Sequence, residues 1–165
     1  MKYILYIILI PFVVFLFSSL SKNKDNDQDS LLNTSEYTAN WLTDYSTARA
    51  KAEAEGKPLM INFTGSNWCS GCIRLDKEIF SKPVFINYAN EHLILLKIDF
   101  PLGVQQEESL INQNNYLYDH YEIEGLPTVI LMDPVVEIYR DYGYGKDSPH
   151  SYVLRLKSLL GQVIE

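Results

Sequence analysis

The chain has 165 residues, of which 47% are hydrophobic and 21% are charged, and its formal net charge is −7. This apolar content is typical of a folded domain and argues against an intrinsically disordered chain. The acidic balance argues against nucleic acid as a partner, because neutralising phosphates requires clustered Lys and Arg, and the sequence has no such cluster.

The N-terminal segment is strongly apolar and carries no charged residue from Tyr3 to Ser21. As a helix it would span about 28 Å, close to the ~30 Å hydrocarbon core of a bilayer. A secretory signal has a shorter apolar core that ends in small residues, for which Ser19-Leu20-Ser21 is a weak match. We therefore expect residues 1–21 to be a signal peptide or a membrane anchor, and either would carry the rest of the chain across a membrane.

A polar stretch separates this segment from the remainder of the chain. Residues 22–35 are predicted to be a linker, followed by one domain over residues 36–165. The domain is expected to begin with a short edge strand at 40–42. Asp44 is a candidate N-cap for the Ala-rich helix that comes next, and Gly56 is placed to end that helix.

The middle of the chain alternates apolar runs with helix-like stretches. We expect a buried strand at 58–63, a helix at 69–80, a second short helix at 84–91 and another buried strand at 93–100. A long polar segment follows at 104–121. Its apolar residues, available for a buried stripe, are Leu110, Ile111, Tyr116, Leu117 and Tyr118.

The C-terminal part predicts two further strands and a closing helix. Ile123–Met132 leads through a turn at Asp133-Pro134 into an alternating strand at 135–142. The helix at 148–160 is amphipathic, ends before Gly161, and has an inner side made of Tyr152, Val153, Leu156, Leu159 and Leu160. The resulting order of elements predicts an α/β fold: a central mixed sheet with helices on both faces, its last two strands antiparallel.

The sequence contains two cysteines, Cys69 and Cys72, at the point where a strand gives way to a helix. Residues three apart on a helix lie roughly 5–6 Å from each other, and a disulfide needs its Cα atoms about 4.4–6.8 Å apart. The pair can therefore open and close with little backbone movement. A purely structural bridge is the weaker explanation, because closing so small a loop stabilises a fold very little.

Two motifs resemble the thioredoxin superfamily. They are Trp68-Cys69-Ser70-Gly71-Cys72 after a strand and Gly125-Leu126-Pro127-Thr128 before a later strand. The element order from about Glu36 to the C-terminus is similar to that of the family. The segment Phe63–Cys69, which leads to the cysteines, resembles the same segment in the family's exported bacterial branch. The resemblance implies a thioredoxin-like fold and an exported thiol–disulfide oxidoreductase.

The resemblance also implies a role for each residue of these motifs. Cys69 would be the exposed nucleophile, at a helix N-terminus that favours a thiolate. Cys72 would be the buried resolving thiol that attacks the mixed disulfide. Pro127 matches the family's cis-proline, Leu126 would offer its main chain to a substrate peptide, and Trp68 would form a wall of the site.

Three features depart from the family pattern. Ser70-Gly71 replaces a dipeptide that commonly contains Pro, so the redox potential cannot be carried over. Asn62 stands nearest the position of a buried carboxylate in the family, and an amide takes no proton at neutral pH; Asp76 or Glu78 acting through water is a weaker alternative. The segment Asp99–Pro127 is longer than in compact members and is expected to form an extended polar helix or loop beside the site.

Other chemistries fit the sequence poorly. A zinc site needs about four ligands, whereas two cysteines stand here with three scattered histidines, His92, His120 and His150, so no metal and no cofactor is expected. A cysteine hydrolase would need a positioned His and a third group, and a second cysteine three residues away would trap its nucleophile as a disulfide.

Three functions remain open within the dithiol interpretation: a reductase or isomerase kept reduced by a membrane electron donor, an oxidant that introduces disulfides, and a non-catalytic peptide-binding module. The intact cysteine pair argues against the third. The first is favoured over the second, because Ser70-Gly71 lacks the His found in strongly oxidising relatives. The expected substrates are exported cysteine-containing proteins. The expected location is periplasmic or extracytoplasmic, with residues 3–21 as an inner-membrane anchor where they are not cleaved.

Overall fold

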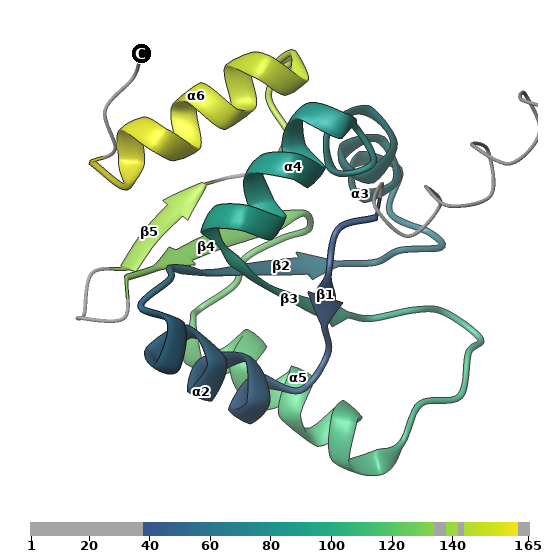
Figure 1. The fold of residues 1–165 in the computed structure, drawn as a ribbon. Coiled ribbons are helices and arrows are strands. Elements are labelled where there is room, and N and C mark those ends of the chain that lie inside the picture. Colours follow the sequence, from purple (N-terminus) through teal and green to yellow (C-terminus); the bar gives the residue numbers. More distant parts are fainter. Residues whose placement is uncertain (1–37, 134–137, 142–143, 162–165) are drawn as a thin grey trace, which may run out of the picture. The chain divides into compact units, whose positions relative to one another are not determined.

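A computed structural model describes residues 38–133, 138–141 and 144–161. Its elements in chain order (Figure 1) are β1 (Trp41–Leu42), α2 (Tyr45–Glu55), β2 (Leu59–Thr64), α3 (Ser70–Leu75), the π-helix η1 (Asp76–Phe80), α4 (Pro83–His92), β3 (Ile94–Asp99), α5 (Glu108–His120), β4 (Thr128–Met132), β5 (Ile138–Asp141) and α6 (Pro149–Leu159). This order confirms the predicted alternation of strands and helices.

The predicted apolar helix at 1–21 and the linker at 22–35 lie outside the described residues, so the proposed domain limits remain predictions. Part of the expected turn at Asp133-Pro134 also lies outside them. Over the ranges that are described, no helix combines the length and the apolar content that crossing a membrane requires.

The sheet has the order β1-β3-β2-β4-β5 in the described part of the chain. Strands β1, β3 and β2 run parallel, while β4 is antiparallel to β2 and β5 is antiparallel to β4. The predicted mixed sheet, with its last two strands antiparallel, is confirmed. Strand β2 lies at the centre, where it pairs Asn62 with Lys97 of β3 and Phe63 with Thr128 of β4.

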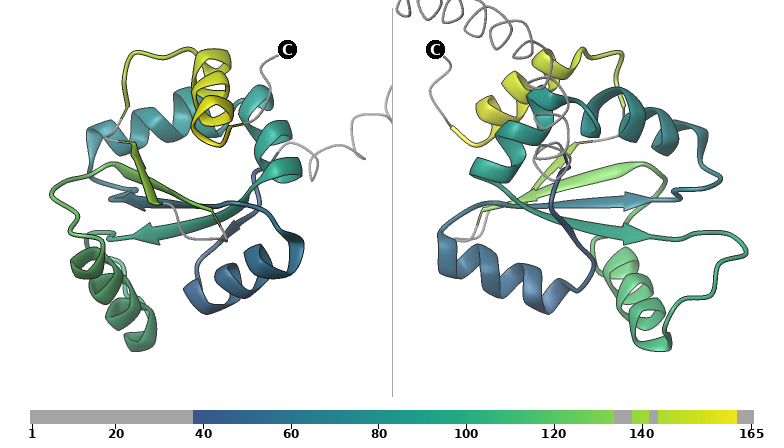
Figure 2. Two further views of the ribbon diagram at one scale, coloured as in Figure 1. Left: turned by 90° about the vertical axis from the view of Figure 1, so that its left-hand side faces the viewer. Right: turned by 45° about the vertical axis from the view of Figure 1, so that its right-hand side comes forward.

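Helices cover both faces of the sheet (Figure 2): α2 and α5 lie on one face, and α3, α4 and α6 on the other. Successive side chains of β2 point alternately to the two faces of the sheet. Ile61 and Phe63 join the core beneath α2 and α5, whereas Met60 joins the core beneath α3, α4 and α6. Each large apolar side chain fully buried in this way stabilises the fold by roughly 1.5–3 kcal/mol.

Local signals in the sequence account for the ends of the first helix. The Asp44 side chain accepts a hydrogen bond of 2.7 Å from Thr47 N–H, and Gly56 ends α2 with a left-handed φ of 62°. Hydrogen bonds from Thr47 and Ser46 lower the pKa of Asp44 to about 2. The predicted cap and stop of this helix are both confirmed.

Helix α6 also agrees with its prediction. Ser148 is its N-cap and accepts a hydrogen bond from Ser151 N–H. Three residues of the predicted inner side are buried and two are half-buried against the same core; in that order they are Tyr152, Val153 and Leu156, then Leu159 and Leu160.

Helix α5 differs from its prediction, because it begins at Glu108 and buries less apolar surface than expected. Of the five apolar residues expected in its buried stripe, Leu117 alone is buried. Ile111 and Tyr116 are 41% and 64% exposed. The reason is that the polar residue Asn114 occupies the inner face, where its amide donates a hydrogen bond of 3.0 Å to the Asp99 carbonyl.

The predicted helix at 69–80 is also not regular throughout. It is α-helical as far as Leu75 and continues as the π-helix η1, whose wider turn is closed by a bond of 2.8 Å from Ser81 N–H to Asp76 O. This turn brings the consecutive residues Ile79 and Phe80 into the core together. A single π turn of this kind inside a helix is frequent at functional sites.

Candidate active site

Cys69 and Cys72 form a disulfide whose Cα atoms lie 5.2 Å apart. This distance falls within the range that a disulfide needs, about 4.4–6.8 Å. Cys69 is the N-cap of α3, and its Sγ accepts a hydrogen bond of 3.2 Å from Cys72 N–H. The prediction that the two sulfurs meet one helical turn apart is confirmed.

The two cysteines differ in burial less than expected. Cys72 is 2% exposed and Cys69 is 8% exposed, so Cys69 is the more accessible of the pair. The expectation of an exposed Cys69 is nevertheless wrong for this disulfide form. Its sulfur is bonded to Cys72 and also contacts the Cys72 N–H, which draws it against the start of the helix.

Trp68 lies at the surface beside the disulfide and is 48% exposed. Its indole Nε1 donates a hydrogen bond of 2.7 Å to the carbonyl of Phe100. The ring lies over Gly65 so closely that a Cβ at that position would stand 2.5 Å from the Trp68 Cε2. Trp68 is thus held half-exposed in the position directly before Cys69.

Pro127 is brought against the loop between the cysteines. The Leu126–Pro127 peptide bond is cis, as the motif predicted. A Cβ on Gly71 would lie 3.1 Å from Pro127 Cδ, so the proline ring faces the Ser70-Gly71 dipeptide across a narrow gap. The side chain of Leu126 packs partly against the core beneath α2 and α5. Its main chain lies beyond the last ladder pair of β4, Phe63–Thr128.

Asn62, which stands nearest the position of the family's buried carboxylate, is buried and polar but not acidic. Asn62 is 4% exposed, and its Oδ1 finds no hydrogen-bond partner among the described residues. Asp76 and Glu78 are both exposed, and Glu78 accepts a hydrogen bond from the hydroxyl of Tyr144, which raises the pKa of that tyrosine. Neither carboxylate therefore replaces a buried acid beside Cys72.

Sequence reasoning missed a set of polar contacts that hold the loop before Cys69. Asp99, at the end of β3, accepts hydrogen bonds from the N–H and the hydroxyl of Ser66, at 2.9 and 2.6 Å. Asn67 exchanges two hydrogen bonds with the main chain of Leu102, at 2.8 and 3.0 Å. A signal was present: parallel strands end at the same edge of a sheet, so Asp99 had to lie near the residues that follow β2.

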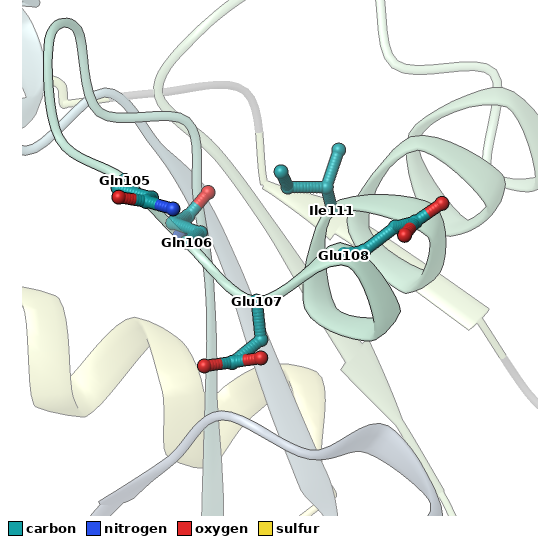
Figure 3. A pocket seen from close by; sticks show the side chains of 5 residues that line it. All are labelled: Gln105, Gln106, Glu107, Glu108 and Ile111. Atoms are coloured by element: carbon teal, nitrogen blue, oxygen red, sulfur yellow. The ribbon is translucent and has the colours of Figure 1, made fainter.

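The polar segment after β3 and the start of α5 form a cavity of about 650 Å³ (Figure 3). It is lined by Gln105, Gln106, Glu107, Glu108 and Ile111. None of the residues predicted for the dithiol site lines it. Across the described ranges, no group of three or more His, Cys, Asp or Glu residues is arranged to hold a metal ion.

Residues 40–134 match the model of a family described as thioredoxin-like. The chain belongs to this family. Two proteins of Chlamydia pneumoniae are similar to this thioredoxin-like chain. The disulfide bond reductase DsbH is 29% identical over 116 residues, which are 70% of each chain. The thioredoxin-related protein DsbJ is 28% identical over 131 residues, 79% of this chain but 35% of DsbJ.

Solved structures agree with this assignment. A structure described as the DsbH oxidoreductase has a TM-score of 0.71 at 27% identity and covers 84% of this chain and 95% of its own. A thioredoxin from Thermus thermophilus, 17% identical with a TM-score of 0.55, shares the fold over 74% of this chain and 88% of its own. Family, fold and the Cys69–Cys72 disulfide together place the chain among the thiol–disulfide oxidoreductases.

Proposed function

We propose that the protein is an exported oxidoreductase that reduces or isomerises disulfides in exported proteins through the Cys69–Cys72 dithiol. The observation that carries this proposal is the disulfide itself, formed at the start of α3 with Pro127 close to Gly71 between the two cysteines. The likeness to a relative described as a disulfide bond reductase supports the reducing direction.

The reaction takes two thiol–disulfide exchange steps. The Cys69 thiolate attacks one sulfur of a substrate disulfide, whose S–S bond breaks, and the other substrate sulfur leaves as a thiolate. The Cys72 thiolate then attacks Cys69 Sγ, so that the mixed disulfide breaks and the Cys69–Cys72 bond forms. The substrate gains two electrons, and the protein loses them. A membrane electron donor would return the protein to the dithiol form.

Trp68, Leu126 and Pro127 would bind the substrate chain around this dithiol. Trp68 presents a half-exposed indole next to Cys69. The main chain of Leu126 lies outside the ladder between β2 and β4, so it can pair with an extended peptide that brings its disulfide to Cys69. Pro127 would keep this stretch of backbone close to the two sulfurs.

Single cysteine variants test the mechanism. We expect Cys72→Ser to accumulate a mixed disulfide with a peptide that contains one disulfide, because the second attack cannot occur. Cys69→Ser should form no such adduct and should reduce nothing. Mass spectrometry of the quenched reaction distinguishes these products. Normal turnover by Cys72→Ser would overturn the two-thiol mechanism.

The main rival is an oxidant that introduces disulfides, and the redox potential separates the two. We expect equilibration with glutathione to give a potential toward the ~−270 mV of thioredoxin rather than the ~−120 mV of strong oxidants. Ser70-Gly71 supports this expectation, since it contains no His to stabilise the reduced form. A value near that of strong oxidants would favour the rival function.

We also propose a periplasmic or other extracytoplasmic location for the domain. The apolar run of residues 3–21 and the polar stretch of residues 22–35 support export with either cleavage or retention as an inner-membrane anchor. Comparing the mass of the mature protein with that of the full chain decides between them. Recovery of the full chain in the soluble cytoplasmic fraction would overturn the proposal.

A further inference from the structure

The loop that leads from β2 to the cysteines is tied to the end of β3 on both sides of Gly65. On one side, Phe100 N–H donates a hydrogen bond of 2.9 Å to Thr64 O. On the other side, both carboxylate oxygens of Asp99 bind Ser66, one through its N–H at 2.9 Å and one through its hydroxyl at 2.6 Å. Gly65 is therefore held between two anchored neighbours.

Gly65 contacts both cysteines through its own main chain. Its N–H lies 3.5 Å from Cys72 Sγ and donates to it, while its carbonyl accepts a bond of 2.9 Å from Cys69 N–H. The Cys69 sulfur, by contrast, accepts its hydrogen bond from Cys72 N–H within α3. Of the two sulfurs, that of Cys72 is the one that the loop contacts.

Asp99 is itself fixed from the other side. The buried amide of Asn114 donates a hydrogen bond of 3.0 Å to the Asp99 carbonyl, and Gln106 donates another at 3.4 Å. Asp99 therefore lies at the junction of β3, α5 and the loop before the cysteines. Its carboxylate is oriented before any substrate binds.

We propose that Asp99 is a positioning residue for Cys72: by holding Ser66 it fixes the Gly65 N–H that binds the Cys72 sulfur. This inference rests on the proposed dithiol function and concerns its second step. There the Cys72 thiolate bonds to Cys69 Sγ, the substrate sulfur leaves as a thiolate, and the Cys72 thiol proton passes to solvent.

The physical reason is that a hydrogen bond to an ionised sulfur is stronger than one to a neutral sulfur, so a fixed N–H favours the attacking thiolate. The donor must also stay in place, because displacements of about 1 Å can slow an enzymatic step substantially.

A single-turnover experiment with an aromatic disulfide separates the two steps. The reduced protein is mixed with 5,5′-dithiobis(2-nitrobenzoate), and the absorbance of released thionitrobenzoate is followed by stopped flow. Attack by Cys69 releases the first thionitrobenzoate and leaves the second bound to Cys69. Attack by Cys72 on that mixed disulfide releases the second. The two phases therefore report the two sulfurs separately.

We expect Asp99→Ala to slow the second phase about tenfold and to change the first less than about twofold, since the loop contacts the Cys72 sulfur alone. Asp99→Asn should restore the second phase to within about threefold, because its amide oxygen still accepts from Ser66 N–H. Glu107→Ala, which removes an exposed carboxylate from the segment after β3, should behave like the wild type.

Ser66→Ala provides a milder test if Asp99→Ala does not fold. It removes the hydroxyl bond alone and should slow the second phase about threefold. An unchanged second phase in the folded variants, or an equal slowing of both phases, would overturn the role of Asp99. Release of a single thionitrobenzoate by the wild type would instead overturn the dithiol function on which the inference rests.

Discussion

Two positions beside the cysteines require glycine, because a neighbouring ring leaves little room for a larger side chain. Gly65 leaves room for the indole of Trp68, which covers it and reaches the Phe100 carbonyl. Gly71 leaves room for the ring of Pro127. Neither has a positive φ, so their small size, rather than backbone freedom, explains their place at the site.

Replacing Gly65 tests this account. We expect Gly65→Ala to displace the Trp68 indole, because the added Cβ would lie 2.5 Å from Cε2. The hydrogen bond to Phe100 would break, which costs roughly 0.5–1.5 kcal/mol of unfolding free energy, and the Trp68 emission would move to longer wavelength. Fluorescence and urea unfolding in a Trp41→Phe background would measure both effects.

Gly125→Ala is the matched control, because no atom lies within 4 Å of a Cβ at that position and its φ is not positive. It should leave the emission and the urea midpoint nearly unchanged. If Gly65→Ala kept the native emission, the packing of Trp68 on Gly65 would not hold in solution.

At the scale of elements, the cap of α2 makes stability depend on pH. Hydrogen bonds from Thr47 and Ser46 lower the pKa of Asp44 from its ordinary value of 3.8 to about 2 in the folded chain. Because the folded pKa is the lower one, the cap stabilises the fold fully above about pH 4. That contribution is lost as the pH falls toward 2.

We therefore expect Asp44→Ala to lower the urea midpoint at pH 7 and to lower it much less near pH 2, where the wild-type carboxylate is about half protonated in the folded chain and most of its contribution is lost. Urea titrations of both proteins at the two pH values would measure the difference. If the urea midpoints of the two proteins differed equally at both pH values, the charged cap would not be responsible.

Helix α5 offers a paired test of its corrected packing. Leu117 is 1% exposed, so Leu117→Ala should cost about 2–5 kcal/mol through lost burial and the cavity that remains. Ile111 is 41% exposed, and Ile111→Ala should stay within about 0.5 kcal/mol of the wild type. Chemical denaturation measures both changes in unfolding free energy. Similar losses for the two variants would instead support the wide apolar stripe expected from the sequence.

Most elements could be predicted because their signals are local. The N-cap at Asp44, the stop at Gly56 and the apolar run of β2 depend on neighbours in the chain. The start of α5 and the π turn of η1 could not be predicted in this way. Asn114 faces inward because of a carbonyl on β3, and the wide turn follows from the packing of two consecutive side chains.

In the candidate site, too, the features with local signals could be predicted and those that depend on distant residues could not. Cys69, Cys72 and Pro127 belong to short motifs, and the structure brings them together as the motifs predicted. The bonds from Ser66 to Asp99 join residues 33 apart in the sequence, so no window along the chain contains both. The burial of Cys69 could not be read from its position either, because its sulfur is bonded to Cys72 and accepts a hydrogen bond from the Cys72 N–H.

For the whole molecule, the reducing function makes a prediction about stability. The redox potential of the dithiol and the difference in folding stability between its two oxidation states are linked, and about 30 mV corresponds to ~1.4 kcal/mol. A strong oxidant is more stable when reduced, whereas a reductant is expected to be more stable when oxidised.

We therefore expect the disulfide form to unfold at a higher urea concentration than the dithiol form. Circular dichroism with and without a reducing agent measures both midpoints. A variant with both Cys69→Ser and Cys72→Ser is the control, since its midpoint should not respond to the reductant. A reduced form that is the more stable of the two would point to an oxidant.

Strand β2 is paired on both sides, and all six of its residues are buried. Amide hydrogens in such a strand exchange with deuterated water only when the whole domain unfolds. The loop that leads to Cys69 begins at the end of this strand. The strand that supports the loop therefore belongs to the slowest-exchanging part of the domain. Binding and release of a substrate therefore leave β2 in place, and the two sulfurs keep the same position from one turnover to the next.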